Sequence, residues 1–452
     1  MKSFLQRVLS DIDVEYSDIR IEETEISTIA YRGRELDECR KNFERGGILR
    51  LFKKGNWTTA SFNTVDDGLK EIAQKKAREL ELLPPKEETL FLFPPLEWMS
   101  LATQEKDCRK IPLTEKIDLV RKYNEILLSG DSIVSTLTNY TERYKTTYFY
   151  STENRYIEQR QVYLRILLSA IARDGSNIQD YAKSFYSREG IEALKGKEEE
   201  AEKIAKMAHN LLKAEKVDAG IYTVIIDPKL AGIFAHEAFG HLSEADLLYT
   251  NERLRELMKI GTTYGVEELS IVDDPTLSGE WGSYQFDDEG TPAQKTYLIK
   301  EGKIASHLHS KETAKRMGEE PTGNARSIDY RFPPICRMSN TFIEPRNKSL
   351  EAMLEDIDKG LYVAGARGGM TELEFFTFSS QFAYKIEKGE MTNLVRDVVI
   401  QGNVFETLRN IKAIGNDFEI ASGGCGKGAQ YPLPTGTGGP HIQIKNCLIG
   451  GK

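Results

Sequence analysis

Residues 222–241 read YTVIIDPKLAGIFAHEAFGH, and the interpretation of the whole chain depends on the change from strand to helix in this stretch. The run from Tyr222 to Ile226 is rich in β-branched residues and predicts a short buried strand. Asp227 followed by Pro228 is typical of a helix start, because aspartate caps free N–H groups and proline fits the first helical position. The stretch therefore predicts a strand that leads directly into a helix with two histidines.

The two histidines, His236 and His241, are five residues apart, with Glu237 between them. In the protease signature H-E-x-x-H the step is four residues, which leaves the imidazoles about 40° apart on one helix face. A five-residue step leaves them about 140° apart, so a straight α-helix would not bring both rings to one metal. A π-bulge would do so, and so would a helix that ends at Gly240 and lets His241 swing back. The alternative is two unrelated histidines on an amphipathic helix, which the scarcity of histidine in the chain (six in all) disfavours.

A catalytic zinc ion usually has three protein ligands, so a third ligand is needed. The candidates are the residues Glu244, Asp246, His307, His309 and His441 and the five cysteines. Among the cysteines, Cys425 lies in the glycine-flanked segment Gly423 to Gly428, which predicts a loop able to bend around an ion. Lys427 nearby would favour the thiolate. The other four, Cys39, Cys108, Cys336 and Cys447, have ordinary surroundings, and a buried thiol in a turn is the alternative for Cys425.

The composition indicates an ordinary globular protein of 452 residues, long enough for two or three folding units. A net charge of −9 without a basic block disfavours nucleic acid as a partner. Neither a signal-like apolar run at the N-terminus nor a stretch of 18 apolar residues is found, which predicts a cytoplasmic protein with no membrane contact. Five widely spaced cysteines predict reduced thiols rather than a disulfide framework.

Glycine divides the chain, because residues 1–220 hold only 10 of the 36 glycines. We expect an α+β fold with a strand-rich, barrel-like catalytic domain over residues 221–452 that carries the metal-binding helix. The first half repeats a theme of alternating strands followed by a helix, once with a helix over 65–83 and once with a helix over about 191–216. This repeat predicts two sheet-plus-helix subdomains, 1–83 and 113–220, joined by a proline-rich linker over 84–112.

Several motifs of the second half resemble those of the TldD/PmbA family, and of its TldD branch in particular. They are His236 to His241, Asp287-Asp288-Glu289-Gly290, Thr322 to Arg326, Met338 to Thr341, and Gly423 to Lys427 followed by Gln430. The resemblance implies a zinc-dependent peptidase that acts on unfolded proteins or peptides, with zinc (Zn2+) held by His236, His241 and Cys425. The PmbA-like subunit, also called TldE, lacks the histidine pair, so this chain resembles the catalytic subunit. The resemblance implies a dimer, either a homodimer or a heterodimer with a PmbA/TldE-like subunit.

With such a metal, Glu237 is expected to act as general base, taking a proton from water and passing it to the leaving amine. Arg326, with Asn324 in the same motif, is expected to contact a substrate carbonyl or carboxylate, the alternative being a surface salt bridge. The acidic run 287–289 predicts a turn cluster rather than a second metal site. The segments 365–370 and 432–440 are expected to be a hairpin or substrate-edge loop and a rigid turn.

A second function remains open at this point. The family's association with control of DNA gyrase suggests a non-catalytic regulatory or binding protein with a structural zinc. The open fourth position of a three-ligand site, together with Glu237, favours the peptidase. Because 184 residues separate His241 from Cys425, we expect an enclosed site that admits an extended peptide and excludes folded proteins.

Overall fold

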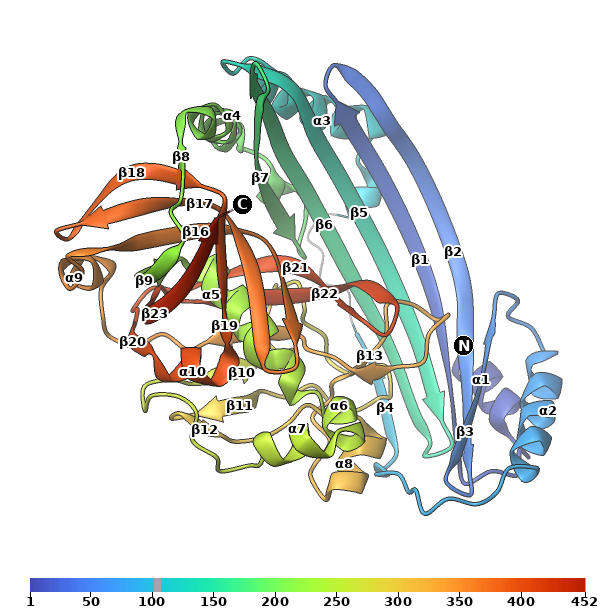
Figure 1. The fold of residues 1–452 in the computed structure, drawn as a ribbon. Helices are drawn as coiled ribbons and strands as arrows, with labels where there is room; N and C mark the ends of the chain where they lie inside the picture. Colours follow the sequence, from blue (N-terminus) through green and yellow to red (C-terminus); the bar gives the residue numbers. More distant parts are fainter. Residues whose placement is uncertain (101–106, 452) are drawn as a thin grey trace.

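The computed structural model describes residues 1–100 and 107–451. A long curved sheet from the first half of the chain lies against a C-terminal domain built from two larger sheets and one two-stranded sheet (Figure 1). The fold is α+β and strand-rich, as predicted. No helix in the described part of the chain is long and apolar enough to span a membrane.

The N-terminal sheet has seven strands. Their order is β3 (Asn56–Phe62), β2 (Glu35–Lys53), β1 (Tyr16–Arg32), β5 (Ile133–Ser151), β6 (Arg155–Asp174) and β4 (Leu96–Met99), and β7 (Asn177–Ser187) also pairs with β6. β1 and β5 pair antiparallel from Asp18 opposite Ser151 to Arg32 opposite Leu137. The two predicted sheet-plus-helix units are therefore joined in one continuous sheet, because each contributes a long strand to the central pair.

The expected linker contributes to this sheet. It contains β4, which pairs parallel with β6, and a 3-10 turn at Cys108–Lys110, while its residues 101–106 lie outside the described part. The helix expected over 191–216 is divided into a 3-10 turn at Ile191–Leu194 and α4 at Glu198–Lys213. Gly196 lies between them with φ +68°. A right-handed helix cannot continue through this left-handed backbone conformation, which glycine adopts readily.

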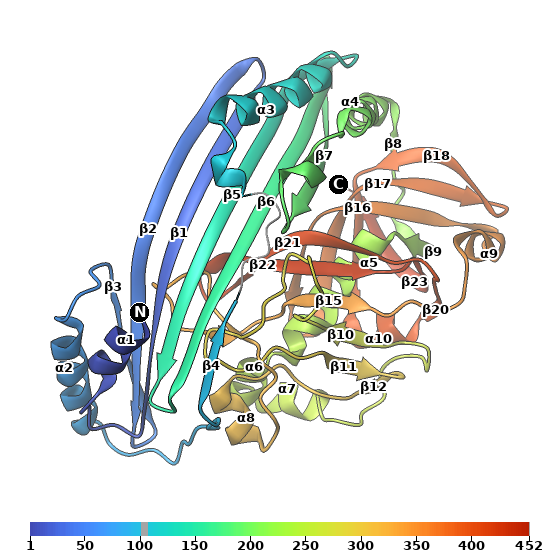
Figure 2. The same ribbon diagram turned by 180° about the vertical axis from the view of Figure 1, so that it is seen from behind.

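Helices cover one face of the sheet at its two ends (Figure 2). α1 (Lys2–Leu9) and α2 (Leu69–Glu81) pack at one end, and α3 (Leu113–Leu128) and α4 at the other. Side chains on β1 alternate, so Ile19 and Ile21 face α1 and α2 while Arg20 faces the C-terminal domain. The second face of the sheet is therefore polar.

The acidic run 287–289 fastens the C-terminal domain to this polar face. Asp287 accepts hydrogen bonds from the main-chain N–H groups of residues 289, 291 and 325, which confirms the predicted turn cluster. Asp288 and Glu289 pair with two arginines of the sheet, Arg20 at 3.2 Å and Arg50 at 2.8 Å. The turn is thus also an interdomain contact, which the sequence did not predict.

The C-terminal domain contains a closed five-stranded barrel, in agreement with the barrel-like expectation. Its strands are β16 (Lys359–Glu372), β9 (Gly220–Ile226), β23 (Ile442–Gly451), β19 (Val398–Asn403) and β17 (Phe375–Glu387), and β17 closes the barrel by pairing with β16. β18 (Glu390–Arg396), β8 (Glu215–Lys216) and β20 (Ile411–Ile414) extend this sheet.

A six-stranded sheet lies beside the barrel. Its order is β12 (Lys303–Ile304), β11 (Thr296–Lys300), β10 (Ile271–Asp273), β15 (Asn340–Ile343), β22 (Gln430–Gly439) and β21 (Glu419–Lys427). Short helices α6 (Ala245–Thr250), α7 (Glu252–Leu257), α8 (Lys311–Met317), α9 (Leu350–Glu355) and α10 (Val404–Arg409) fill the connections, and β13 (Ala325–Arg326) pairs with β14 (Ile335–Cys336).

Two glycine- or proline-rich segments expected to be a loop and a turn are strands, since residues 423–427 lie in β21 and 432–439 in β22. Residues 365–370, expected to be a hairpin or a substrate-edge loop, lie in β16, which forms a hairpin with β17. The prolines of β22 are tolerated because β22 pairs with β15 only from Gly436 to Gly438, so the outer edge at Pro432 and Pro434 needs no N–H donor. Tertiary pairing thus outweighs the local turn preference of these residues.

Candidate metal centre

The helix that carries the histidines, α5 (Pro228–Phe234), is fixed at its start to the barrel. Asp227 accepts hydrogen bonds from the N–H of Leu230 at 2.7 Å and from that of Gly365 in β16 at 2.9 Å. Further along, α5 touches β22, since a Cβ on Gly232 would lie 2.2 Å from the nitrogen of Gly438. Glycine permits this approach, which sets the distance between the helix and the β21–β22 hairpin.

A π-helical turn over Ala235–Gly240 follows α5. The N–H of His241 donates to the carbonyl of His236, a five-residue step in place of the four-residue step of an α-helix. The two imidazoles therefore lie on the same side, with ring centroids 5.1 Å apart and ring planes at 81°. Of the two alternatives, the π-bulge is the one that the structure has, and a straight α-helix through His241 is excluded.

The third group of the centre comes from the edge strand β21. The Sγ of Cys425 is 3.5 Å from Nε2 of His241, and donor atoms of His236, His241 and Cys425 all lie within 4.8 Å of one another. His236 and Cys425 are buried, and the buried Nδ1 of His236 has no hydrogen-bond partner within the described protein. Two imidazoles and a thiol gathered around one point fit a zinc ion, which takes nitrogen and sulfur ligands.

The electrostatics of the site favour a thiolate. Burial alone raises the pKa of the Cys425 thiol, but the adjacent imidazoles of His236 and His241 lower it well below its usual value. A thiolate is the form of cysteine that binds metals. Burial lowers the pKa of His241, but Glu244 and Cys425 outweigh that effect and raise it well above its usual value, so a metal ion that binds here displaces the proton of that ring.

Glu244 and Asp246, two of the candidates for the third ligand, lie behind His241 instead. The fully buried Glu244 accepts a hydrogen bond from Nδ1 of His241 at 3.1 Å. It also forms an ion pair with Lys427 at 3.0 Å. Burial raises the pKa of Glu244, but Lys427 and His241 outweigh that effect and lower it to about 2. Glu244 is thus a carboxylate that orients a candidate ligand, a role the sequence did not predict.

Lys427 contacts carboxylates rather than the thiol. Its Nζ also lies 2.6 Å from Asp246 and donates to the carbonyl of Cys336 at 2.9 Å. The sequence does contain a signal that Lys427 lies near the Cys425 side of the segment, because residues two apart in a strand share a face. That signal applies only to a strand, whereas the glycines of this segment predict a loop.

The other candidate histidines do not join this centre. His307 and His309 lie with Glu319 in a separate group, and His441 pairs with Asp417 at 2.7 Å. Glu237 is half-buried next to β16, where a Cβ on Gly369 would lie 2.9 Å from its Cγ. The segment 365–370, expected at the substrate edge, therefore flanks the expected general base.

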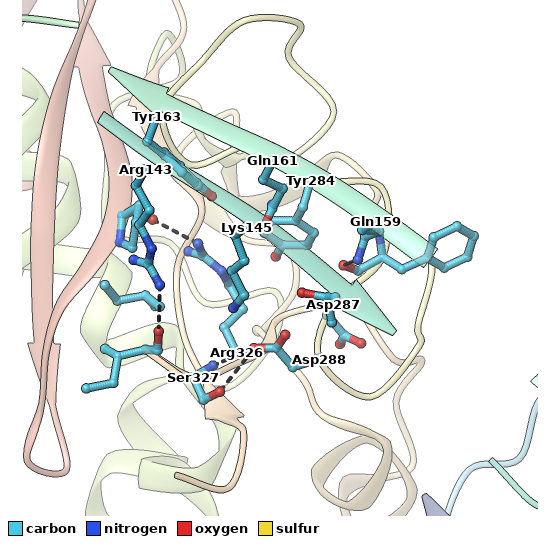
Figure 3. A pocket seen from close by; sticks show the side chains of 15 residues that line it. Arg143, Lys145, Gln159, Gln161, Tyr163, Tyr284, Asp287, Asp288, Arg326 and Ser327 are labelled. Atoms are coloured by element: carbon cyan, nitrogen blue, oxygen red, sulfur yellow. Dashed lines mark hydrogen bonds between the residues drawn. The ribbon is translucent and has the colours of Figure 1, made fainter. Parts of the chain in front are cut away.

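Arg326 and Asn324 are held by contacts inside the protein. Asn324 is fully buried and donates to Asp273 at 2.8 Å. Arg326 donates to the carbonyl of Pro434 at 2.8 Å and to that of Met338, rather than forming a surface salt bridge. It lines a polar pocket between the N-terminal sheet and the C-terminal domain (Figure 3). A substrate contact by either residue stays a prediction.

A second cavity, of about 310 Å³, adjoins the strand that carries Cys425. The N-terminal sheet contributes Arg143, Tyr163 and Arg165, and the hairpin contributes Gly423 and Gly424, among others. Both domains therefore line this cavity, whereas His236, His241 and Cys425 are not among its lining residues.

Comparison with known proteins identifies the class. The PmbA/TldA metallopeptidase C-terminal domain matches residues 219–451, the central domain matches 106–214, and domain 1 matches 17–80. A metalloprotease of Synechocystis is 38% identical over 97% of this chain and 95% of its own, and one of Methanothermobacter thermautotrophicus is 36% identical over 99% and 98%. A zinc metalloprotease TldD homolog of Saccharolobus solfataricus is 28% identical over 98% of both chains.

Solved structures agree in fold. A candidate modulator of a DNA gyrase from Thermotoga maritima superposes with a TM-score of 0.81 at 22% identity, covering 99% of this chain and 100% of its own. TldE from Thermococcus kodakarensis gives 0.79 at 20% identity, with 99% and 98% covered. The family matches and the metalloproteases among the relatives indicate a metallopeptidase. The chain belongs to the PmbA/TldD family, as its motifs predicted.

Proposed function

We propose that this protein is a zinc-dependent peptidase whose metal is held by His236, His241 and Cys425. The observation that carries the proposal is the π-helical turn, which places both imidazoles beside the Cys425 thiol. Zinc bound there would supply Lewis-acid polarisation of the scissile carbonyl and a water of lowered pKa. Three protein ligands leave a coordination position for that water.

Glu237 is the proposed general base. It follows a ligand in sequence, belongs to neither candidate metal group, and is half-buried against β16. In this role the carboxylate takes a proton from the attacking water and then delivers it to the leaving amine. The main-chain carbonyl of Glu237 accepts a hydrogen bond from the Thr371 hydroxyl at 2.5 Å, which fixes the residue to β16.

The proposed substrate is an extended segment of an unfolded protein or peptide. β21 is the terminal strand of its sheet in the described structure, so a peptide backbone could pair with its outer edge near Cys425. Gly423 and Gly424 leave room beside it, in the cavity that both domains line. A folded domain could not reach an edge confined in this way.

We propose that the protein acts in the cytoplasm, without nucleic acid or membrane partners, as a dimer. The partner is a second copy or a PmbA/TldE-like subunit, and the similarity in fold to TldE supports such a pairing. The competing function is a regulatory protein with a structural zinc, which the description of the Thermotoga maritima relative as a candidate gyrase modulator favours.

Replacement of Glu237 by glutamine distinguishes the two functions. Zinc content by elemental analysis and cleavage of an unstructured peptide are measured on the wild type and on Glu237→Gln. A peptidase requires that the variant keep its zinc and lose cleavage, since only the base is removed. A wild type that holds zinc and cleaves no unstructured peptide, alone or with a PmbA/TldE-like subunit, would instead support the structural role.

A further inference from the structure

A second group of metal-binding side chains lies outside the proposed active site. His307, His309 and Glu319 converge between α7 and α8. Nδ1 of His307 is 3.0 and 3.1 Å from the two carboxylate oxygens of Glu319, and Nε2 of His309 is 3.1 Å from one of them. The histidines are 3% and 0% exposed, whereas the Glu319 side chain is 19% exposed.

The hydrogen bonds of His307 require an additional positive charge. Its Nε2 faces the carbonyl of Met258 at 2.8 Å, and a carbonyl only accepts, so Nε2 carries a proton. Its Nδ1 faces the Glu319 carboxylate, which when ionised also only accepts. This contact therefore needs either a proton, on Nδ1 or on the carboxyl, or a cation between Nδ1 and the carboxylate.

His309 has no such requirement. Its Nδ1 lies 3.1 Å from the hydroxyl of Thr313, which can donate or accept. Without a metal the neutral ring is satisfied as the tautomer in which Nε2 donates to Glu319 and Nδ1 accepts from the Thr313 hydroxyl; when a metal takes Nε2, the proton can move to Nδ1, because Thr313 can also accept. In both histidines the nitrogen remote from Glu319 is already hydrogen-bonded, which is the arrangement that orients a metal-ligating imidazole.

We propose that Nδ1 of His307, Nε2 of His309 and the carboxylate of Glu319 form a second site for a divalent first-row metal ion. The two imidazole-to-carboxylate separations, 3.0 and 3.1 Å, are a few tenths of an ångström below the roughly 3.3 to 3.6 Å between tetrahedral ligands bonded at about 2.0 to 2.2 Å, and all three donor atoms lie within 4.8 Å of one another. Two imidazoles and a carboxylate are a donor set that zinc accepts. Binding expels one proton, the one between Nδ1 of His307 and the Glu319 carboxyl, and moves the proton of His309 to the nitrogen facing Thr313.

This site is linked by main-chain hydrogen bonds to the proposed active site. Leu308, between the two histidines, donates to the carbonyl of Ser243 at 2.8 Å, and the N–H of Ala245 donates to the carbonyl of Leu308 at 3.0 Å. These contacts flank Glu244, the carboxylate that orients His241. A metal on the histidine pair would fix the segment around Leu308, which supports the first centre. The role of this second metal is therefore structural and does not depend on the proposed peptidase activity.

The test uses cobalt(II) as probe on the full chain, after removal of bound metal with a chelator. Cobalt on the first centre gives a sulfur-to-metal charge-transfer band, because Cys425 is a thiolate ligand, whereas cobalt on the second site gives none. We expect the wild type to bind roughly two ions and Cys425→Ser roughly one, without the band. Binding of that ion should release about one proton, measured in weakly buffered solution.

The matched variants are Glu319→Gln and Glu320→Gln in the Cys425→Ser background. Glu320 is exposed and belongs to neither candidate metal group, so its variant should bind as its parent does, while Glu319→Gln should lose the remaining ion. Equal binding by the two variants would overturn the proposal. So would a wild type that binds about one ion with the full charge-transfer band, a result that needs no substitution and leaves the first centre intact.

Discussion

Replacement of Glu244 by glutamine tests whether the carboxylate behind His241 prepares the metal centre. Glutamine keeps the shape of this fully buried side chain and removes its charge. In the wild type the carboxylate accepts a hydrogen bond from Nδ1 of His241 at 3.1 Å and pairs with Lys427 at 3.0 Å. Both contacts are weakened in the variant. Loss of a hydrogen-bond partner of a metal ligand typically lowers metal affinity by about 10- to 100-fold.

That factor corresponds to about 1.4 to 2.8 kcal/mol of zinc binding free energy. The assay is competition for zinc against a chromophoric chelator at pH 7. Asp246→Asn is the matched control, because Asp246 pairs with Lys427 at 2.6 Å but makes no hydrogen bond to His241. We expect the control to bind zinc within about threefold of the wild type. Equal affinities for Glu244→Gln and Asp246→Asn would refute the proposed role of Glu244 in orienting His241.

Four further outcomes are expected. Cys425→Ser should lose most of its active-site zinc and all peptidase activity, because a hydroxyl is a poor zinc ligand, whereas Cys336→Ser should keep both by elemental analysis and peptide assay. Gly369→Ala should lower kcat about 10-fold or more at unchanged zinc content, since its Cβ would displace the side chain of the general base. Arg50→Ala leaves two buried carboxylates without their partner and should cost about 3 to 5 kcal/mol in urea unfolding, against less than about 1 kcal/mol for exposed Arg45→Ala. An unstructured peptide should be cleaved, and a stably folded protein containing the same sequence should resist until it is denatured; equal rates would contradict an enclosed site.

The local features of the site could be predicted from the sequence because short-range rules determine them. Asp227 and Pro228 mark the helix start, and the structure has the capping hydrogen bond that these residues predict. The five-residue step from His236 to His241 required a break in the α-helical pattern, and a π-helical turn provides it. Resemblance was needed only to choose Cys425 among the remaining ligand candidates.

Long-range pairing could not be predicted in the same way. Alternation along residues 18–32 and 133–151 indicates strands, but nothing in either pattern states that β1 pairs with β5 across more than 100 residues of chain. For the same reason the glycine and proline content of β21 and β22 predicts a loop and a turn rather than strands. Their strand conformation depends on hydrogen bonds to each other and to β15.

The histidine–glutamate group shows where a sequence signal was incomplete. His307 and His309 are two residues apart, which predicts that their side chains lie on one face of an extended segment. Glu319 is ten residues further along and follows α8, whose C-terminal Gly318 has φ +70°. The turn after this helix brings the carboxylate back to the histidines, and no periodicity in the sequence indicates that return.

Placing the cysteine ligand on an edge strand connects metal binding with substrate binding. One edge of β21 pairs with β22, where Cys425 lies opposite Leu433, and the register shifts between Cys425 and Lys427. The extra residue of this bulge is in β22, because two steps from Cys425 to Lys427 lie opposite three steps from Leu433 to Gln430, and the thiol on β21 lies 3.5 Å from Nε2 of His241. A peptide paired with the outer edge of the same strand would have its backbone held in register with the thiolate. The position of the scissile carbonyl relative to the metal would then follow from strand pairing rather than from recognition of particular side chains, which is the property expected of a peptidase for unfolded chains.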